Sequence, residues 1–172
     1  FMKECQKKVK NILAICWGMQ VAVTAAGGVV KKSSNGAHIG IANELIINNE
    51  GLEHPLYEGK KNNFNTPAFN FDEVVTLPEN GVCLASNKIN KVQSMYFKIN
   101  NNNVWGLQYH PEITYQKMIQ LIKFRKDRLI ETRKVFANHD QVDEHISFIE
   151  KEISISDNQQ RMIELKNWLN SF

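Results

Sequence analysis

Apolar residues in the first part of the chain form short runs separated by Gly, Asn and Pro, a pattern typical of strands joined by turns. The first run covers residues 9–15 and ends at Cys16. Helix-forming residues follow at positions 17–26, and Gly27-Gly28 then provides a helix C-terminal signal. We therefore predict that a strand, a sharp turn and a helix follow one another at the start of the chain.

Six further strand-like runs follow, so the middle of the chain is predicted to be mostly β structure. They lie at residues 29–30, 39–47, 74–77, 82–85, 92–99 and 104–109. Several of them end in Gly, Asn or Pro, which are common turn residues. The asparagine run at residues 100–103 is predicted to form the turn between the last two strands.

From Tyr115 onwards the apolar spacing changes to that of helices, with Met118, Leu121, Ile122, Leu129 and Ile130 near one face. Residues 117–134 carry seven Lys or Arg and two Asp or Glu, whereas residues 138–157 carry six acidic residues and one Lys. This pattern fits an antiparallel helix pair with complementary facing charges. Two solvated faces explain it equally well, because surface ion pairs contribute little.

A last helix is predicted at residues 158–169, with Met162, Leu165, Trp168 and Leu169 on one face as core residues. Taken together, the elements predict an α/β fold. Its sheet is expected to be mixed and mostly parallel, flanked by helices, and followed by a helical C-terminal extension.

The composition suits one cytosolic globular domain. The chain has 172 residues, 42% of them hydrophobic, and a net charge of +3, which is too small to indicate nucleic-acid binding. No run approaches the roughly 18 apolar residues of a membrane span, and the N-terminus lacks the features of a secretory signal. Cys5, Cys16 and Cys83 fit neither a disulfide framework nor a zinc site, and the histidines do not cluster at ligand spacing. We therefore expect a cytoplasmic protein with no metal, no nucleic acid and no membrane partner.

Residues 14–20, Ala-Ile-Cys-Trp-Gly-Met-Gln, place Cys16 between the predicted strand and helix. A nucleophile on such a tight turn is exposed above the sheet, where the following backbone N–H and the helix N-terminus stabilise an anion. Gly18 allows the helix to pack close to the strand. The alternative is a buried and inert cysteine, the commonest state of a lone cytosolic Cys.

A second motif covers residues 106–112, Gly-Leu-Gln-Tyr-His-Pro-Glu. Pro111 favours an extended conformation at His110, so the side chains of His110 and Glu112 are expected on the same side. Glu112 can then orient the imidazole, whose other nitrogen is free to take a proton from a thiol. This is the nucleophile, base and orienting group of a catalytic triad. Taken alone, a His before Pro at a strand end is more often structural.

Together, these motifs resemble those of class I (triad-type) glutamine amidotransferases, Gly-x-Cys-x-Gly-x-Gln and Gly-x-Gln-(Phe/Tyr)-His-Pro-Glu. Residues 72–78, 84–87 and 92–93 are similar to the family's intervening strands, nearest to the stand-alone branch similar to the amidotransferase domain of GMP synthase. The helical tail at residues 119–169 is similar to that branch's C-terminal extension. The resemblance implies flavodoxin-like layering, with an incomplete amidotransferase core at residues 1–114 and a helical extension at residues 115–172 packed on the same domain.

The resemblance also implies hydrolysis of the glutamine side-chain amide. Cys16 would form a γ-glutamyl thioester, His110 would act as base and then as acid, and Glu112 would orient it. The backbone N–H of Trp17 would form half of the oxyanion hole, and Gln20 would help to hold the substrate. No phosphate-binding loop is present. We therefore expect no cofactor, and a synthetase partner on another polypeptide if the ammonia is used.

Three features depart from the family pattern. Members normally carry two βαβ-type units, roughly 60 residues, before the nucleophile, including a Gly-rich loop that completes the oxyanion hole. Only fifteen residues precede Cys16 here, which suggests a split enzyme that needs an N-terminal fragment, or a decayed remnant of low activity. Ala14 stands where the family prefers Gly. Asn70 stands near the position where the family usually has a His, and this difference affects the expected wall of the substrate pocket.

Two other functions stay open at this point. The same triad could serve a γ-glutamyl hydrolase that acts on the amide of a small amine, with water as the final acceptor. Alternatively, a relic or binding module would keep the fold, bury Cys16 and act only through surfaces such as the helix pair at residues 117–157.

Overall fold

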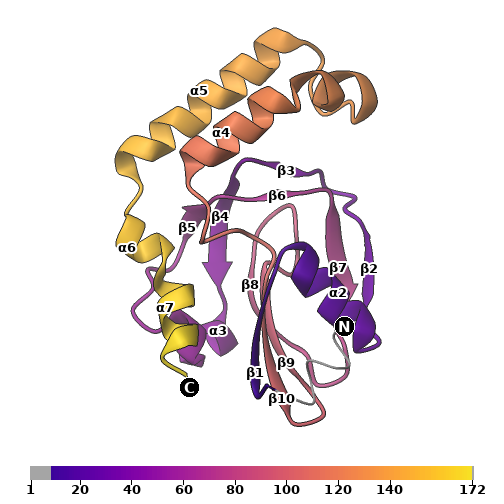
Figure 1. Cartoon of the computed structure of the whole chain (residues 1–172), viewed down its shortest axis with the longest axis vertical. Helices are drawn as coiled ribbons and strands as arrows, with labels where there is room; N and C mark the ends of the chain where they lie inside the picture. The colour runs from indigo at the N-terminus through magenta and orange to yellow at the C-terminus, as the bar shows by residue number, and fades with distance from the viewer. Residues whose placement is uncertain (1–8, 172) are drawn as a thin grey trace.

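The computed structural model describes residues 9–171, and its central element is a six-stranded sheet (Figure 1). The strand order is β1-β10-β9-β8-β4-β5. These strands are β1 (Asn11–Ile15), β10 (Asn102–Leu107), β9 (Ser94–Ile99), β8 (Val82–Ser86), β4 (Ala42–Ile47) and β5 (Phe64–Thr66). β1 lies parallel to β10, with Ala14 opposite Gly106, and the remaining neighbours are antiparallel.

The α/β class and the mixed sheet are confirmed, but the expectation of a mostly parallel sheet is wrong for the described strands. One of the five neighbouring pairs in this sheet, β1 with β10, is parallel. For β9 and β10 the physical reason is the short connection, because a parallel pair needs a crossover of a dozen or more residues. β9 and β10 are joined by a tight turn in which Asn100 has a φ of 53°, so they must run antiparallel.

The predicted strand, turn and helix at the start of the chain are confirmed. α2 (Trp17–Ala25) follows β1 directly and ends before Gly27, which has a φ of 86°. Its buried residues, Met19, Ala22 and Val23, pack with sheet residues such as Phe97 in one hydrophobic cluster. α2 is thus fixed against the sheet at its N-terminal end, where Cys16 lies.

Two short ribbons lie beside this sheet. β2 (Val29–Lys32) pairs with β7 (Asp72–Thr76), and β3 (His38–Ile39) pairs with β6 (Phe69–Asn70). The strand predicted at residues 39–47 is interrupted, because Gly40 adopts a φ of 86° between β3 and β4. The sequence pattern also missed α3 (Asn49–Glu53) and the 3₁₀ turn at Pro55–Tyr57.

α4 (Tyr115–Phe124) and α5 (His139–Ile155) form an antiparallel pair, joined through a π-helical turn at Arg128–Thr132 (Figure 1). Their buried residues pack on Ile39 and Ile41 in a separate hydrophobic cluster. Of the expected facing charges, Lys126 pairs with Asp143 at 3.0 Å. No helix within residues 9–171 is long and apolar enough to cross a membrane.

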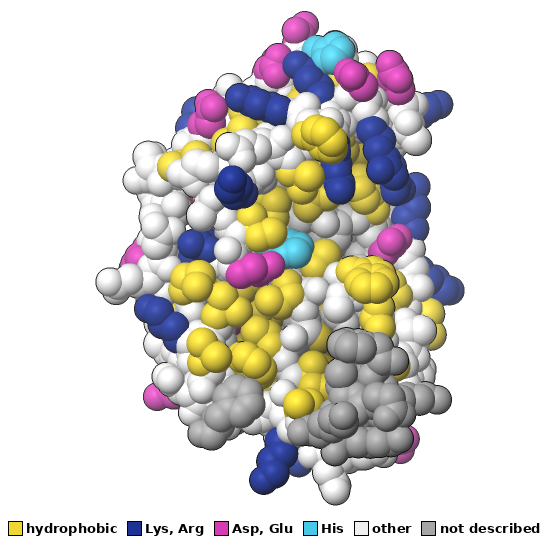
Figure 2. Space-filling model, in the orientation of Figure 1, with side chains coloured by type: hydrophobic (Ala, Val, Ile, Leu, Met, Phe, Trp, Pro, Cys, Tyr) yellow, Lys and Arg dark blue, Asp and Glu magenta, His cyan; other side chains and the backbone are white. Residues whose placement is uncertain are grey.

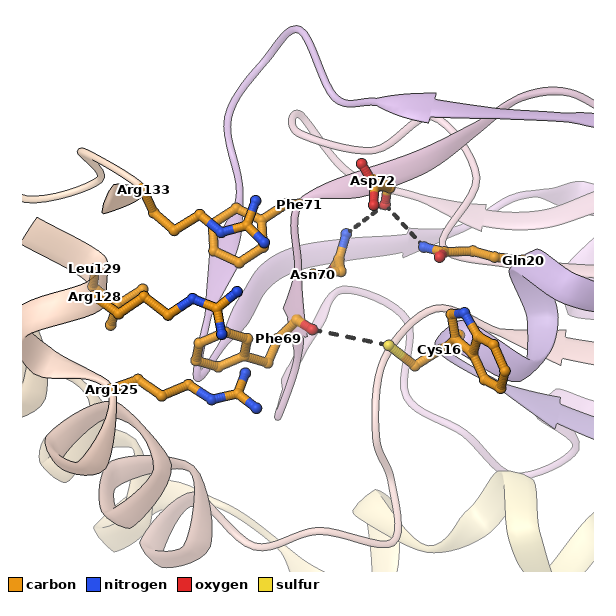
Figure 3. A pocket seen from close by; sticks show the side chains of 11 residues that line it. Cys16, Gln20, Phe69, Asn70, Phe71, Asp72, Arg125, Arg128, Leu129 and Arg133 are labelled. Atoms are coloured by element: carbon orange, nitrogen blue, oxygen red, sulfur yellow. Dashed lines mark hydrogen bonds between the residues drawn. The ribbon is translucent and has the colours of Figure 1, made fainter. Parts of the chain in front are cut away.

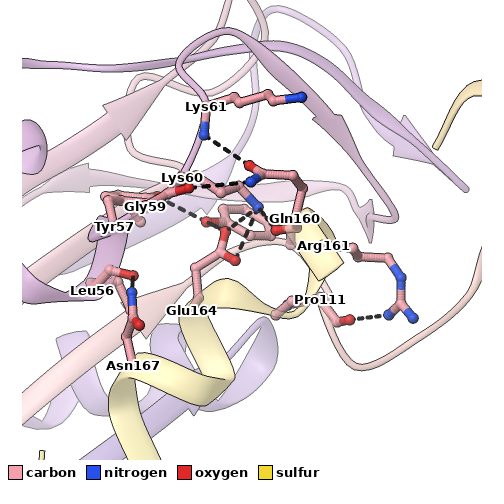
Figure 4. Close-up of polar contacts among 12 residues, drawn as sticks. Leu56, Tyr57, Gly59, Lys60, Lys61, Pro111, Gln160, Arg161, Glu164 and Asn167 are labelled. Atoms are coloured by element: carbon pink, nitrogen blue, oxygen red, sulfur yellow. Dashed lines mark hydrogen bonds and ion pairs between the residues drawn. The ribbon is translucent and has the colours of Figure 1, made fainter. Parts of the chain in front are cut away.

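The last predicted helix is divided at Met162 into α6 (Asn158–Arg161) and α7 (Ile163–Leu169). The predicted core face is wrong in two places: Leu169 is 61% exposed, and Glu164 is fully buried. Glu164 is buried because Lys60, from a distant loop, meets it at 3.0 Å (Figure 4). Met162 and Leu165 are half-buried, and Trp168 packs against a hydrophobic cluster that contains Leu107 and Tyr109.

Candidate active site

Cys16 lies on the sharp turn between β1 and α2, as the sequence predicts. Its backbone has φ 51° and ψ −111°, a left-handed conformation that is strained for a residue with a side chain. Its N–H donates to the carbonyl of Leu107 at 2.6 Å, which continues the parallel pairing of β1 with β10. Because α2 begins at Trp17, the N–H groups of its first turn have no partner within the helix and can bind an anion beside the sulfur.

The close approach of α2 to the sheet depends on Gly106 in β10. A Cβ added to Gly106 would lie 2.7 Å from Cγ of Met19 and 2.9 Å from its sulfur. Gly106 is the first residue of the second motif, so that motif also positions the helix that follows the nucleophile.

His110 and Glu112 lie on the segment that follows β10. Since β1 and β10 are parallel neighbours, their carboxyl ends meet at the same edge of the sheet, which brings this segment to Cys16. The N–H of His110 donates to the carbonyl of Pro67 at 2.8 Å, and its Nδ1 lies 2.6 Å from Oε1 of Glu112. The two side chains therefore face one another, as expected from the His-Pro-Glu order.

The environment of His110 favours its charged form. Burial by itself would lower the pKa of His110, but hydrogen bonds with Cys16 and Glu112, together with the charges of both groups, raise it to about 9. The imidazole thus interacts with the thiol on one side and with the carboxylate on the other. This arrangement can carry a proton between a sulfur nucleophile and a leaving group.

The C-terminal helices hold the His110 segment from both ends. Before His110, the hydroxyl of Tyr109 donates to Glu164 of α7 at 2.7 Å. After His110, the guanidinium of Arg161, the last residue of α6, donates to the carbonyls of Pro111 and Ile113.

A pocket of about 200 Å³ opens beside the sulfur of Cys16 (Figure 3). It is smaller than the roughly 300–1,000 Å³ of typical drug-sized ligand sites, so it suits a small substrate. His110 and Glu112 lie outside its lining. The lining residues are Cys16, Trp17, Gln20, Phe69, Asn70, Phe71, Asp72, Arg125, Arg128, Leu129 and Arg133.

Gln20 joins the two motifs across the site. Its side-chain amide donates to Oε1 of Gln108 at 3.1 Å and to the carbonyl of Asp72 at 3.2 Å. The amide of Gln108 in turn lies 3.6 Å from the sulfur of Cys16. Trp17, the other expected substrate-binding residue, is 75% exposed at the mouth of the pocket, so its backbone rather than its ring is the part held in place.

Asn70, which the sequence comparison with the family pattern places near a usual His, is held by a buried polar network. Its Oδ1 lies 3.1 Å from Nδ1 of His38, and its Nδ2 donates to Asn90 and to the carbonyl of Asp72. Burial lowers the pKa of His38 to about 4, so this ring is neutral at physiological pH. The substitution therefore leaves the pocket wall ordered.

The wall opposite Cys16 consists of residues that the sequence motifs did not indicate. Phe69 and Phe71 come from β6 and its end, and Arg125, Arg128 and Arg133 come from the end of α4 and the turn that follows. In the sequence, the basic stretch at residues 117–134 is the feature that contains these arginines, and it predicts one side of a helix pair rather than a pocket wall. Phe69 lies in the short strand β6 and Phe71 directly follows it, and the sequence pattern did not reveal this strand.

Two further predictions concern cysteines and metals. Cys83 is half-buried and packs against the cluster that contains Met19 and Phe97, and burial raises its pKa. Cys5 lies outside the described residues. Among residues 9–171, no three His, Cys, Asp or Glu side chains are grouped so that they could hold a metal ion.

The chain is similar to known proteins in sequence and in fold. A family model described as glutamine amidotransferase class-I matches residues 1–126. A γ-glutamyl-L-1-hydroxyisopropylamide hydrolase from a Pseudomonas species is 35% identical over 106 residues, which cover 60% of this chain and 36% of that protein. One subunit of the glutamine-hydrolyzing GMP synthase from Methanoculleus marisnigri is 30% identical over 104 residues, which cover 60% of this chain and 53% of the relative.

The fold has solved counterparts. The structure of a glutamine amidotransferase from Thermotoga maritima superimposes with a TM-score of 0.69 at 18% identity, over 99% of this chain and 65% of that one. At this identity the likeness concerns the fold alone. The chain thus spans between about a third and two thirds of the length of these relatives. Since the family model covers most of the chain, the protein belongs to the class I glutamine amidotransferase family.

Proposed function

We propose that this chain hydrolyses the side-chain amide of glutamine through Cys16, His110 and Glu112. The observation that carries the proposal is the position of the strained Cys16 turn beside the paired His110 and Glu112, with the His110 pKa raised by both neighbours. The small pocket at the sulfur and the family membership support it.

In the proposed reaction, the ionised sulfur of Cys16 attacks the amide carbon of glutamine, because the thiolate is the nucleophilic form. The negative carbonyl oxygen accepts a hydrogen bond from the backbone N–H of Trp17. His110 then gives its proton to the nitrogen as the carbon–nitrogen bond breaks, which releases ammonia and leaves a γ-glutamyl thioester. His110 next takes a proton from water, whose oxygen attacks the thioester, and glutamate and the free sulfur are formed.

The fate of the ammonia depends on a partner. Several relatives are named as one of the subunits of a GMP synthase, and we propose that ammonia from this chain likewise serves a synthetase on a separate polypeptide. A second candidate follows from the Pseudomonas relative, whose name denotes a γ-glutamyl amide hydrolase. In that reaction the same triad releases a small amine, and water is the final acceptor.

The first experiment is treatment of the purified chain with a glutamine-mimicking electrophile, followed by intact mass and peptide mapping. We expect one adduct on Cys16, blocked by excess glutamine and absent in Cys16→Ser. Half-buried Cys83 serves as an internal control for unspecific alkylation. Adducts spread over other cysteines, or no adduct, would contradict the proposal. Ammonia release from glutamine, compared with amine release from γ-glutamyl amides, then separates the two candidates.

A further inference from the structure

Three arginines form the wall of the pocket that faces Cys16. Arg125 is at the end of α4, Arg128 is in the π-helical turn, and Arg133 directly follows that turn. Figure 3 shows their side chains extending from the helical region into the pocket towards Phe69 and Phe71, with Cys16 on the far side. In Figure 2, Lys and Arg side chains gather next to hydrophobic ones on the upper part of the molecule, where these helices lie.

Two of these guanidinium groups are placed by aromatic rings. Cζ of Arg125 lies 5.3 Å from the centre of the Phe69 ring, and Cζ of Arg133 lies 4.5 Å from that of Phe71. A stacked guanidinium keeps its N–H donors free in the plane of the group. The rings therefore orient the two arginines without occupying the donors that would bind an anion.

The three arginines have no carboxylate partner within residues 9–171. The contrast is Lys126, in the same stretch, which is bound to both carboxylate oxygens of Asp143 at 3.0 and 3.1 Å. Asp72 is the acidic residue among those that line the pocket. Within residues 9–171 it forms no ion pair with the three arginines. Three guanidinium groups thus share the pocket with one carboxylate, an excess of positive charge that suits an anionic ligand.

The position of His110 indicates which part of a substrate fills the pocket. The leaving nitrogen must come close to His110, which gives it a proton, and His110 lies outside the pocket lining. The acyl part, on the other side of the scissile bond, therefore extends into the pocket towards the arginines.

We propose that Arg125, Arg128 and Arg133 bind a carboxylate on the acyl part of the substrate and select anionic γ-glutamyl donors. The proposal rests on the proposed function, because it takes Cys16 as the nucleophile. The carboxylate has two possible sources with the same chemistry, the α-carboxylate of glutamine and a second carboxylate attached through its α-amine. The C-terminal helical region would then contribute substrate specificity to a site whose chemistry lies on β1 and β10.

The test measures binding to Cys16→Ser by isothermal titration calorimetry, so it does not depend on turnover. The ligands are L-glutamine, its α-amide, N-succinyl-L-glutamine and γ-glutamylglycine. Arg128→Gln removes the arginine that takes part in neither of the two stacks, so both stacks stay intact. We expect it to weaken binding of carboxylate-bearing acyl groups by roughly tenfold or more, the usual effect of one charge-assisted hydrogen bond. Lys123→Gln removes an exposed charge of α4 that lies outside the pocket lining, so it is the matched control and should change nothing.

The outcomes separate the sources. If Arg128→Gln weakens the binding of glutamine and leaves the binding of its α-amide unchanged, the proposal is supported and the α-carboxylate is the group that the arginines bind. Weaker binding confined to N-succinyl-L-glutamine supports it and identifies the second carboxylate. If Arg128→Gln weakens the binding of γ-glutamylglycine alone, the anion lies on the leaving group and the proposal is overturned. The proposal is also overturned if the protein binds the ligands with and without an acyl-group carboxylate equally well. Failure of the proposed function would instead appear as the absence of both Cys16 labelling and ammonia release.

Discussion

The buried ion pair between Lys60 and Glu164 provides a quantitative test of how the C-terminal helices are held. Their side chains are 2% and 0% exposed, and Lys60 Nζ lies 3.0 Å from Glu164 Oε1. Tyr109 donates to the same carboxylate, and its hydroxyl lies 2.8 Å from that of Tyr57. Burial lowers the pKa of Lys60 and raises that of Glu164 despite their attraction, so desolvation is the larger effect on both groups.

Replacing Glu164 with Gln keeps the shape but leaves the Lys60 ammonium without its counter-charge. We expect the free energy of unfolding to fall by about 3–5 kcal/mol, the usual cost of removing one partner of a buried pair. That is a large part of the roughly 5–15 kcal/mol that stabilises an ordinary domain. Because desolvation opposes the pair, the double variant Lys60→Met with Glu164→Gln should recover much of the loss.

The assay is urea unfolding followed by circular dichroism and by tryptophan fluorescence, with the two transitions required to coincide. Glu44→Gln is the matched control. It breaks the Lys88–Glu44 pair, which has a similar distance of 2.7 Å but side chains that are 86% and 60% exposed. Such an exposed pair contributes little, so the control should stay near wild type. A Glu164→Gln variant as stable as the control, or a double variant as unstable as Glu164→Gln, would refute the reasoning.

Four further predictions concern the site and the fold. Because the His110 pKa is raised to about 9, the stability it contributes, at most about 3 kcal/mol, is complete below about pH 6.5 and is lost as pH rises through 9. Glu112→Gln should move the His110 titration to lower pH, as followed by NMR; an unchanged midpoint would contradict the role of Glu112. Gly106→Ala should cost about 1–3 kcal/mol in urea unfolding, because the new Cβ overlaps Met19; wild-type stability would argue against that close contact. Gly40→Ala should lower the unfolding free energy by about 1–3 kcal/mol, since φ is 86° there and two isoleucines of α4 and α5 lie within 2.8 Å of the new Cβ; a neutral result would show that the loop relaxes.

The sequence alone was sufficient for the features that depend on neighbouring residues. The order of apolar strand, Cys16 and helix formers predicts the turn, because a strand followed at once by a helix leaves little choice of backbone path. The alternation of His110 and Glu112 around Pro111 likewise predicts that the two side chains face one another. Both predictions agree with the structure, and the family motifs agree with the match to residues 1–126.

Other features depend on residues far apart in the chain, and local patterns could not reveal them. The direction of a strand such as β4 follows from its pairing with β8, a segment far along the chain, so the expectation of a mostly parallel sheet was wrong for the described strands. Glu164 lies on a helix face that the local sequence predicts to be polar and exposed. It is buried because Lys60, 104 residues earlier in the chain, forms an ion pair with it. Arg125, Arg128 and Arg133 look like surface charges until β6 places Phe69 and Phe71 beside them. Periodicity reports which face of an element is apolar, but only the tertiary structure decides which charges are brought together and what ligand they can bind.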